Sequence, residues 1–196
     1  MKQRRPGRGV LAVVLGICAG GGATALTADA SAEPQANIGL RPGIAGTSTE
    51  GWWSGTGFHL ALHGDVVFGR TQNRSFGAGP FADVATQSGA VLPGGGLTLH
   101  LPTHAYVPVL LSIGGYGRWH PDQGWSPGIS GEVFLGSRSY NYHSSYVMAG
   151  GLVAQVRQGF GDSAERSIVL AVHLDGELLS LPFVLLYEAL SGSRAK

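Results

Sequence analysis

Charged residues are scarce in this sequence, and their scarcity limits the classes of protein to which it can belong. Only 13% of its 196 residues are Asp, Glu, Lys or Arg, whereas a soluble domain carries about 25%. The chain is nevertheless 43% apolar, which argues against disorder, because disordered chains lack the apolar surface needed to fold. Together with 33 glycines, this composition indicates a β-protein with little charged outer surface.

Lysine, cysteine and long hydrophobic runs are also missing from most of the chain. Beyond residue 32 the only lysine is Lys196, and nine basic residues stand against eleven acidic ones. The sequence has no basic patch, which argues against nucleic acid as a partner. From Gln35 onward no apolar run approaches the roughly 20 residues that a transmembrane helix needs.

The first 32 residues have the pattern of a cleavable signal peptide. Four basic residues within positions 2–8 precede the apolar run GVLAVVLGICA, and Ala30 and Ala32 provide a cleavage site before Glu33. The apolar run is too short and too rich in glycine for a membrane anchor. The sequence therefore predicts a signal peptide over residues 1–32 and one barrel domain over residues 33–196. The single cysteine, Cys18, would leave with the signal peptide.

Alternating apolar and polar residues predict strands along the mature chain. In residues 57–69, GFHLALHGDVVFG, Phe58, Leu60, Leu62, Val66 and Phe68 share one parity, and His59, His63 and Asp65 share the other. Successive side chains of a strand point to opposite faces, so such a strand has one apolar and one polar face. Turn-forming residues divide the chain into eight such segments: 37–45, 52–69, 74–86, 91–101, 106–119, 128–140, 145–158 and 166–178.

The fold class predicted from these segments is all-β, an eight-stranded antiparallel up-and-down β-barrel. The segments are longer than the roughly 5–6 residues of soluble strands and suit tilted strands that cross a bilayer in about 9–11 residues. Residues 181–190 predict a short C-terminal helix with Pro182 in its first turn. The alternation of residues 181–187 also allows a strand there.

The polar parity of the eight segments is unusual for the outside of a soluble barrel. It contains almost no lysine and is interspersed with small residues, which suit the narrow interior of an eight-stranded barrel. Its members are His59, His63, Asp65, Asp83, His100, Glu132, Arg138, Gln155, Arg157, His173, Asp175 and Glu177. From these we predict an interior polar network of His59, His63, Asp65, His100, Glu132, Arg157, His173, Asp175 and Glu177, with the apolar parity facing lipid.

The chain resembles the small outer-membrane β-barrel proteins of Gram-negative bacteria over residues 37–190. The resemblance rests on the leader, on alternating runs such as FHLALHGDVVF and SIVLAVHLDGE, and on aromatic residues near the segment ends (Trp52, Trp53, Trp119, Trp125, Tyr140, Tyr142 and Tyr187). It implies a lipid bilayer and the outer-membrane assembly machinery as partners. Such proteins often end on a strand with a terminal aromatic residue, whereas this chain ends SGSRAK, which favours a helix after the last strand.

Three features suggest more specific chemistry, and each has a plainer interpretation. His59 and His63 lie about 13 Å apart on one strand face, too far to share a metal ion, although pairing with other strands can bring either one near His100 or His173. Gly94–Gly96 lacks the adjoining Lys, Ser or Thr of a phosphate loop and indicates a kink or bulge. His143 beside Ser144 and Ser145 is typical of turn chemistry.

Some outer-membrane barrels that resemble this chain are lipid A esterases with a Ser–His pair and an acidic residue. An acyl hydrolase acting on lipid A or phospholipid through His143 is therefore one alternative. A soluble, lipocalin-like carrier of an apolar ligand is the other, with the apolar parity lining a cavity. We predict instead a plugged outer-membrane barrel with a structural or interaction role, and we expect no catalytic residues, metal or cofactor.

Overall fold

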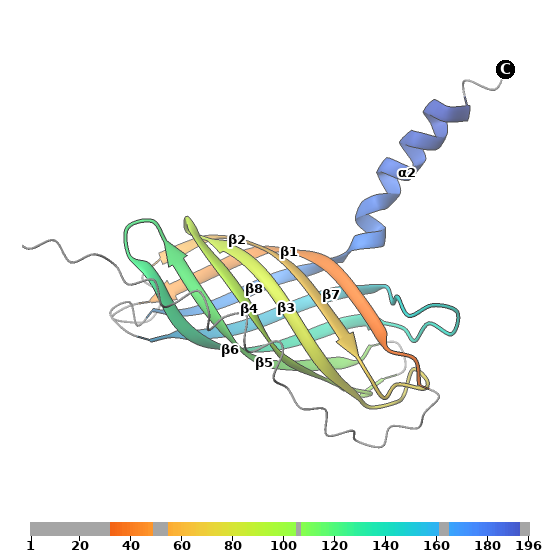
Figure 1. Ribbon diagram of the computed structural model, residues 1–196, viewed down its shortest axis with the longest axis horizontal. Helices are drawn as coiled ribbons and strands as arrows, with labels where there is room; N and C mark the ends of the chain where they lie inside the picture. The colour runs from red at the N-terminus through yellow and green to blue at the C-terminus, as the bar shows by residue number, and fades with distance from the viewer. Residues whose placement is uncertain (1–31, 49–54, 105–106, 161–164, 193–196) are drawn as a thin grey trace, which may run out of the picture. The chain divides into compact units, whose positions relative to one another are not determined.

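The computed structural model describes residues 32–48, 55–104, 107–160 and 165–192, which form a closed antiparallel barrel followed by one helix (Figure 1). The elements are β1 (Gln35–Ser48), β2 (Gly55–Val67), β3 (Gly77–Gln87), β4 (Ala90–Leu101), β5 (Val109–His120), β6 (Gly124–Arg138), β7 (Ala149–Gly159), β8 (Arg166–Asp175) and α2 (Gly176–Gly192). Each strand pairs with the next along the chain, and β8 pairs with β1. The predicted eight-stranded up-and-down barrel and the C-terminal helix are therefore confirmed.

The connections differ between the two ends of the barrel. At one end, which we call the short-turn end, strands are joined through residues 49–54, 88–89, 121–123 and 160–165. At the other, the long-loop end, they are joined through residues 68–76, 102–108 and 139–148. Since the strand number is even, β1 begins and β8 ends at the long-loop end. Neighbouring strands alternate in direction around the whole barrel (Figure 1).

The β5–β6 hairpin is longer than the sequence predicts. The predicted segments 106–119 and 128–140 leave residues 120–127 between two strands, but the turn occupies only residues 121–123 and β6 begins at Gly124. Gly124 has a φ of 75°, a left-handed conformation that glycine adopts without steric cost. Trp119 consequently pairs with Trp125 across the hairpin.

The predicted start of the helix is wrong, and so is the predicted end of the last strand. The strand ends at Asp175 rather than residue 178, and α2 begins at Gly176 rather than residue 181. Asp175 Oδ1 accepts a hydrogen bond of 2.8 Å from the Glu177 backbone N–H, as an N-cap residue does. Pro182 therefore lies inside the helix, and the alternative strand at residues 181–187 is excluded.

Gly94–Gly96 forms no bulge, because β4 pairs with β3 in one uninterrupted register. The glycines instead permit close contact between strands. Gly96 pairs with Gly114 of β5, and a Cβ on Gly96 would collide with the Ile113 carbonyl oxygen. Glycines at such paired positions let the backbones of neighbouring strands approach closely in the wall of a narrow barrel.

Candidate functional site: an apolar outer wall around a polar interior

The outward side chains of the strands form an apolar wall around the barrel. Ile113 is 71% exposed, and Leu97, with which it pairs, is 65% exposed. The exposed large apolar residues of the wall are Ile38, Ile44, Phe58, Leu60, Leu62, Val84, Leu97, Leu99, Leu111, Ile113, Ile129, Val133, Leu135, Leu152, Val156, Leu170 and Val172. Every strand contributes to this set. On the outward parity of the eight described strands the only charged residue is Arg166, the first residue of β8.

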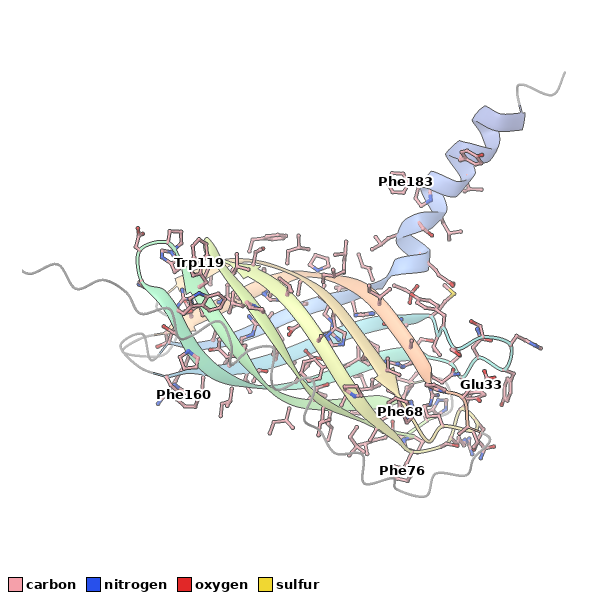
Figure 2. All side chains as sticks on the ribbon, viewed as in Figure 1. Glu33, Phe68, Phe76, Trp119, Phe160 and Phe183 are labelled. Carbon is pink, nitrogen blue, oxygen red and sulfur yellow. The ribbon has the colours of Figure 1, made fainter. Side chains whose placement is uncertain are left out.

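Aromatic side chains mark both ends of this wall. Figure 2 shows Trp119 and Phe160 at the short-turn end, and Phe68 and Phe76 at the long-loop end. All four are exposed, as is Trp125. Of the other aromatic residues predicted for the rims, Trp52 and Trp53 lie outside the described residues, Tyr142 is exposed in the 139–148 connection, and Tyr140 is only partly exposed. Tyr187 lies on α2, so it belongs to neither rim of the barrel.

The inward side chains carry the charge that the wall lacks. Eight charged residues of the described chain are buried, four arginines and four acids: Arg41, Arg70, Arg138, Arg157, Asp65, Asp83, Glu132 and Asp175. Their formal charges cancel, which suits a barrel interior shielded from water. Two apolar clusters lie among them, one around Leu110 and Phe134 and one around Ala85 and Leu92.

Eight of the nine residues predicted for the interior network are buried on inward-facing positions of the strands. They are His59, His63, Asp65, His100, Glu132, Arg157, His173 and Asp175. Glu177 is not among them, because its side chain is exposed on α2. The prediction for Glu177 is wrong because it assumed that the alternation of β8 continues beyond Asp175, where the capped helix begins.

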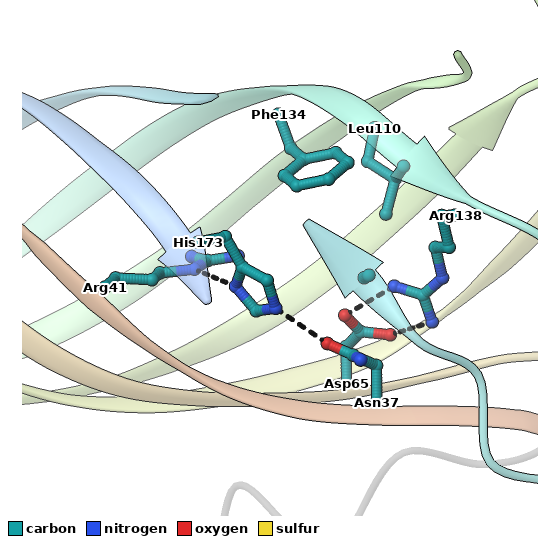
Figure 3. Close-up of a pocket in the computed structure, with 8 residues that line it drawn as sticks. Asn37, Arg41, Asp65, Leu110, Phe134, Arg138 and His173 are labelled. Atoms are coloured by element: carbon teal, nitrogen blue, oxygen red, sulfur yellow. Dashed lines mark hydrogen bonds and ion pairs between the residues drawn. The ribbon is translucent and has the colours of Figure 1, made fainter. Parts of the chain in front are cut away.

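A continuous chain of hydrogen bonds crosses the interior from β6 to β8. Arg41 Nη1 donates to Glu132 Oε2 at 2.8 Å, and Arg41 Nε donates to His173 Nδ1 at 3.0 Å. His173 Nε2 lies 2.9 Å from Asn37 Oδ1 (Figure 3). Asn37 Nδ2 in turn donates to Asp175 Oδ2 at 2.6 Å. Because arginine can only donate, His173 Nδ1 must accept, and the ring proton is therefore on Nε2.

A second group is centred on Asp65 and Arg138. The guanidinium of Arg138 contacts both carboxylate oxygens of Asp65, one of them at 2.7 Å (Figure 3). Such a two-pronged contact is among the stronger ion-pair geometries. His63 Nε2 lies 3.5 Å from the same carboxylate. The rings of His63 and His173 are 6.1 Å apart. Their strands, β2 and β8, do not pair with each other but both pair with β1, so closure of the barrel brings the two histidines together.

A third group lies nearer the short-turn end. Arg157 is 3.9 Å from Asp83 and donates to Gln87 Oε1 at 3.2 Å. His59 is buried nearby, and its Nδ1 has no hydrogen-bond partner among the residues that the structure describes. His100 is separate from this group, with Nδ1 3.1 Å from the Ser75 carbonyl oxygen. Within the described part of the chain, no three His, Cys, Asp or Glu residues are grouped so as to hold a metal ion.

Little free space remains between these groups. A cavity lined by residues of the first two groups, with Leu110, Phe134 and Ala149, has a volume of about 10 Å³ (Figure 3), room for about one water molecule. Arginine and histidine side chains fill the space that the small residues on the same strand faces leave. The barrel interior is therefore packed at this level, and the side chains leave no open channel there.

His143 and its neighbouring serines take part in turn hydrogen bonds. The His143 backbone N–H donates to Asn141 Oδ1 at 2.9 Å, and the Tyr146 N–H donates to Ser144 Oγ at 3.0 Å. These are the local bonds by which Asn and Ser stabilise turns. Among the described contacts of residues 139–148, none joins the His143 ring to Ser144 or Ser145. The described hydrogen bonds of this segment are therefore those of a turn.

Asn37, Arg41 and Arg70 belong to the interior but were missing from the predicted network. In residues 37–45, Asn37 and Arg41 alternate with the apolar residues, so the alternation of that segment is enough to predict that both face the interior. Arg70 lies outside the strands, where alternation carries no information. Its side chain nevertheless points back into the barrel and is 0% exposed.

Helix α2 exposes further apolar side chains. Leu178, Leu181, Leu185 and Tyr187 are all exposed, and Phe183, labelled in Figure 2, is 74% exposed. Among the described residues, no helix combines the length and apolar character required to pass through a membrane.

No protein-family model, curated protein or solved structure matches this chain.

Proposed function

We propose that this chain is an outer-membrane β-barrel protein of a bacterial cell, exported by its signal peptide, with a structural or interaction role. The observation that carries the proposal is the separation of polarity across the strands. Arg166 is the one charged side chain on their outward parity, whereas eight charged residues are buried. This distribution is that of barrels whose outer wall contacts lipid.

The energetics of the outer wall also favour a bilayer over water. Soluble monomers rarely expose a continuous apolar patch of more than a few hundred Å², and here apolar side chains from all eight strands surround the barrel. A lipid environment removes the free-energy cost of exposing this apolar surface to water. A closed barrel also suits a bilayer, because every strand pairs on both sides and leaves no backbone edge unsatisfied.

The lipocalin-like alternative shares the barrel fold but requires the opposite side-chain arrangement. A carrier of apolar ligands needs an apolar cavity and a polar outer surface. Here Arg41, Asp65 and Arg138 line the interior cavity, which has a volume of about 10 Å³, and the outer surface is apolar. The distribution of side chains therefore favours the membrane barrel.

The packed interior points to a role at the barrel ends or within the membrane rather than in passage of solutes. Loops, rims and α2 supply the surfaces for such a role. In this proposal the buried ion pairs stabilise the barrel from within and do not take part in a reaction.

The proposal is tested by expressing the full chain in a Gram-negative host and fractionating the cells. We expect the mature protein in the outer-membrane fraction, resistant to alkaline carbonate extraction, and shifting in gel migration on boiling. A variant that lacks residues 2–32 is the control and should stay in the cytoplasm. Recovery of the mature protein as a soluble periplasmic monomer would contradict the proposal.

A further inference from the structure

Arg70 enters the mouth of the barrel at the long-loop end. It follows β2 in the 68–76 connection, and its side chain folds back across Gly77, the first residue of β3. A Cβ on Gly77 would lie 2.7 Å from Arg70 Cγ, so only glycine leaves room for this side chain. Gly77 pairs with His100 of β4, which places Arg70 beside that histidine.

Among the described residues, the Arg70 guanidinium has no carboxylate partner. Its Nη2 donates to the Arg138 carbonyl oxygen at 3.4 Å, and its Cζ lies 5.8 Å from the centre of the Tyr140 ring. Within the same part of the chain its Nε and Nη1 have no hydrogen-bond partner, which leaves three N–H groups unsatisfied. The other buried arginines of the described chain each have an acid: Arg41 has Glu132, Arg138 has Asp65 and Arg157 has Asp83.

Two neighbouring side chains at this mouth also have unsatisfied nitrogen atoms. Arg138 Nε and His100 Nε2 are both buried, and neither has a hydrogen-bond partner in the ranges that the structure describes. Because His100 Nδ1 faces the Ser75 carbonyl oxygen, it carries the ring proton, and Nε2 becomes a donor only when the ring is protonated. The charged groups around Arg70 are therefore Arg138, His100 when its ring is protonated, and Asp65. The carboxylate of Asp65 is already paired with Arg138.

A buried cation without a counter-ion is strongly disfavoured, and its unsatisfied donors add to the cost. The effect on Arg70 is visible in its pKa, which burial, together with the charge of Arg138, lowers to about 10. An anion placed against the free N–H groups would remove both penalties. Guanidinium groups bind phosphate and carboxylate oxygens through several charge-assisted hydrogen bonds at once.

We propose that the long-loop mouth of the barrel is a binding site for a phosphate-type oxyanion, held by the guanidinium of Arg70 with Arg138 Nε beside it. The phosphate can come from free inorganic phosphate or from a lipid headgroup, and only the second source rests on the proposed membrane function. Because Arg70 is fully buried, the anion enters only when the surrounding connections move apart. Binding is therefore expected to be slow.

The test is a titration of the full chain, folded in the phosphate-free detergent dodecyl maltoside, with inorganic phosphate at constant ionic strength. A ligand that binds only the folded state raises the ratio of folded to unfolded protein about 100-fold at 100 times its Kd. We expect the unfolding midpoint of the wild type to rise with phosphate, and this rise to disappear in Arg70→Gln.

Arg74→Gln is the matched control, since Arg74 lies in the same connection, is exposed and loses the same charge. It should keep the full phosphate response. Arg70→Lys should fold and respond weakly, and it replaces Arg70→Gln in the comparison if the latter does not fold. In phosphate-free buffer Arg70→Gln, where it folds, should be no less stable than the wild type, because it removes an unpaired buried charge.

Micelles containing phosphatidic acid, compared with micelles containing diacylglycerol, identify the source of the phosphate. Stabilisation by phosphatidic acid alone assigns the site to a lipid headgroup, and stabilisation by inorganic phosphate assigns it to the free anion. The proposal is overturned if neither stabilises the wild type, or if Arg70→Gln responds as strongly as Arg74→Gln. Since the measurement is made in detergent, its failure is distinguishable from failure of the membrane assignment.

Discussion

Replacing Ile113 by arginine tests which solvent the outer wall contacts. Ile113 is 71% exposed in β5 and pairs with Leu97 and Gly131. It lies four residues from Val109, the long-loop end of its strand, which is about 13 Å along the strand at roughly 3.3 Å per residue. With a strand tilt of about 40°, this corresponds to a depth of about 10 Å in an apolar band about 25 Å tall.

At that depth Ile113→Arg should lower the free energy of unfolding by about 2–4 kcal/mol in a bilayer, the cost of an arginine near the midplane. Thr86→Arg is the matched control, because Thr86 faces outward one residue from the short-turn end of β3. Near the interface the same change costs only about 0–1 kcal/mol. The assay is denaturant unfolding of both variants and the wild type in neutral-lipid vesicles.

Equal stability of Ile113→Arg and Thr86→Arg would contradict lipid contact of the outer wall at Ile113. On a water-facing wall, an arginine in place of an exposed isoleucine changes stability by at most about 0.5 kcal/mol. Lipid contact therefore predicts that the loss of unfolding free energy on substitution by arginine is larger at Ile113 than at Thr86. The same loss at both positions contradicts lipid contact.

Three further outcomes follow from the interior. Asp65→Asn leaves Arg138 buried without its carboxylate and should cost about 3–5 kcal/mol in denaturant unfolding, whereas the double variant with Arg138→Met should cost less than the sum of the single changes. Gly114→Ala places a methyl group against the Gly95 carbonyl oxygen and should cost about 1–3 kcal/mol. Gly115→Ala should be neutral, because a Cβ on the outward-facing Gly115 makes only an ordinary contact of 3.7 Å with the Gly128 carbonyl oxygen. Planar-bilayer recordings should show no large stable conductance, because buried arginine, histidine and acidic side chains fill the interior and the cavity between Arg41, Asp65 and Arg138 holds about one water.

Alternation along the chain was sufficient to predict the barrel and the side of each strand that faces inward. Such a pattern has a period of two residues and needs no tertiary information. The pairing of particular side chains could not be predicted this way. Arg41 and Glu132 are 91 residues apart on strands that are not neighbours, and they meet only because the barrel is closed and narrow.

Alternation carries no signal where strands end. Asp175 is the last inward-facing residue of β8, and it also caps α2. Glu177 has the parity of the inward-facing residues of β8, but it lies on the helix and its side chain is exposed. Arg70 follows the last paired residues of β2 and returns into the barrel because Gly77 leaves space for it. Both outcomes depend on local geometry at the long-loop end and not on the periodicity of the strand sequences.

Spin labels on single cysteines measure whether the outer wall contacts lipid or water. The chain without residues 1–32 contains no cysteine, so each label reports one position. In lipid vesicles, a label at Leu170, which faces outward in β8, should collide with oxygen far more often than with a water-soluble nickel complex. A label at Leu170 that collides mainly with the nickel complex would contradict the account.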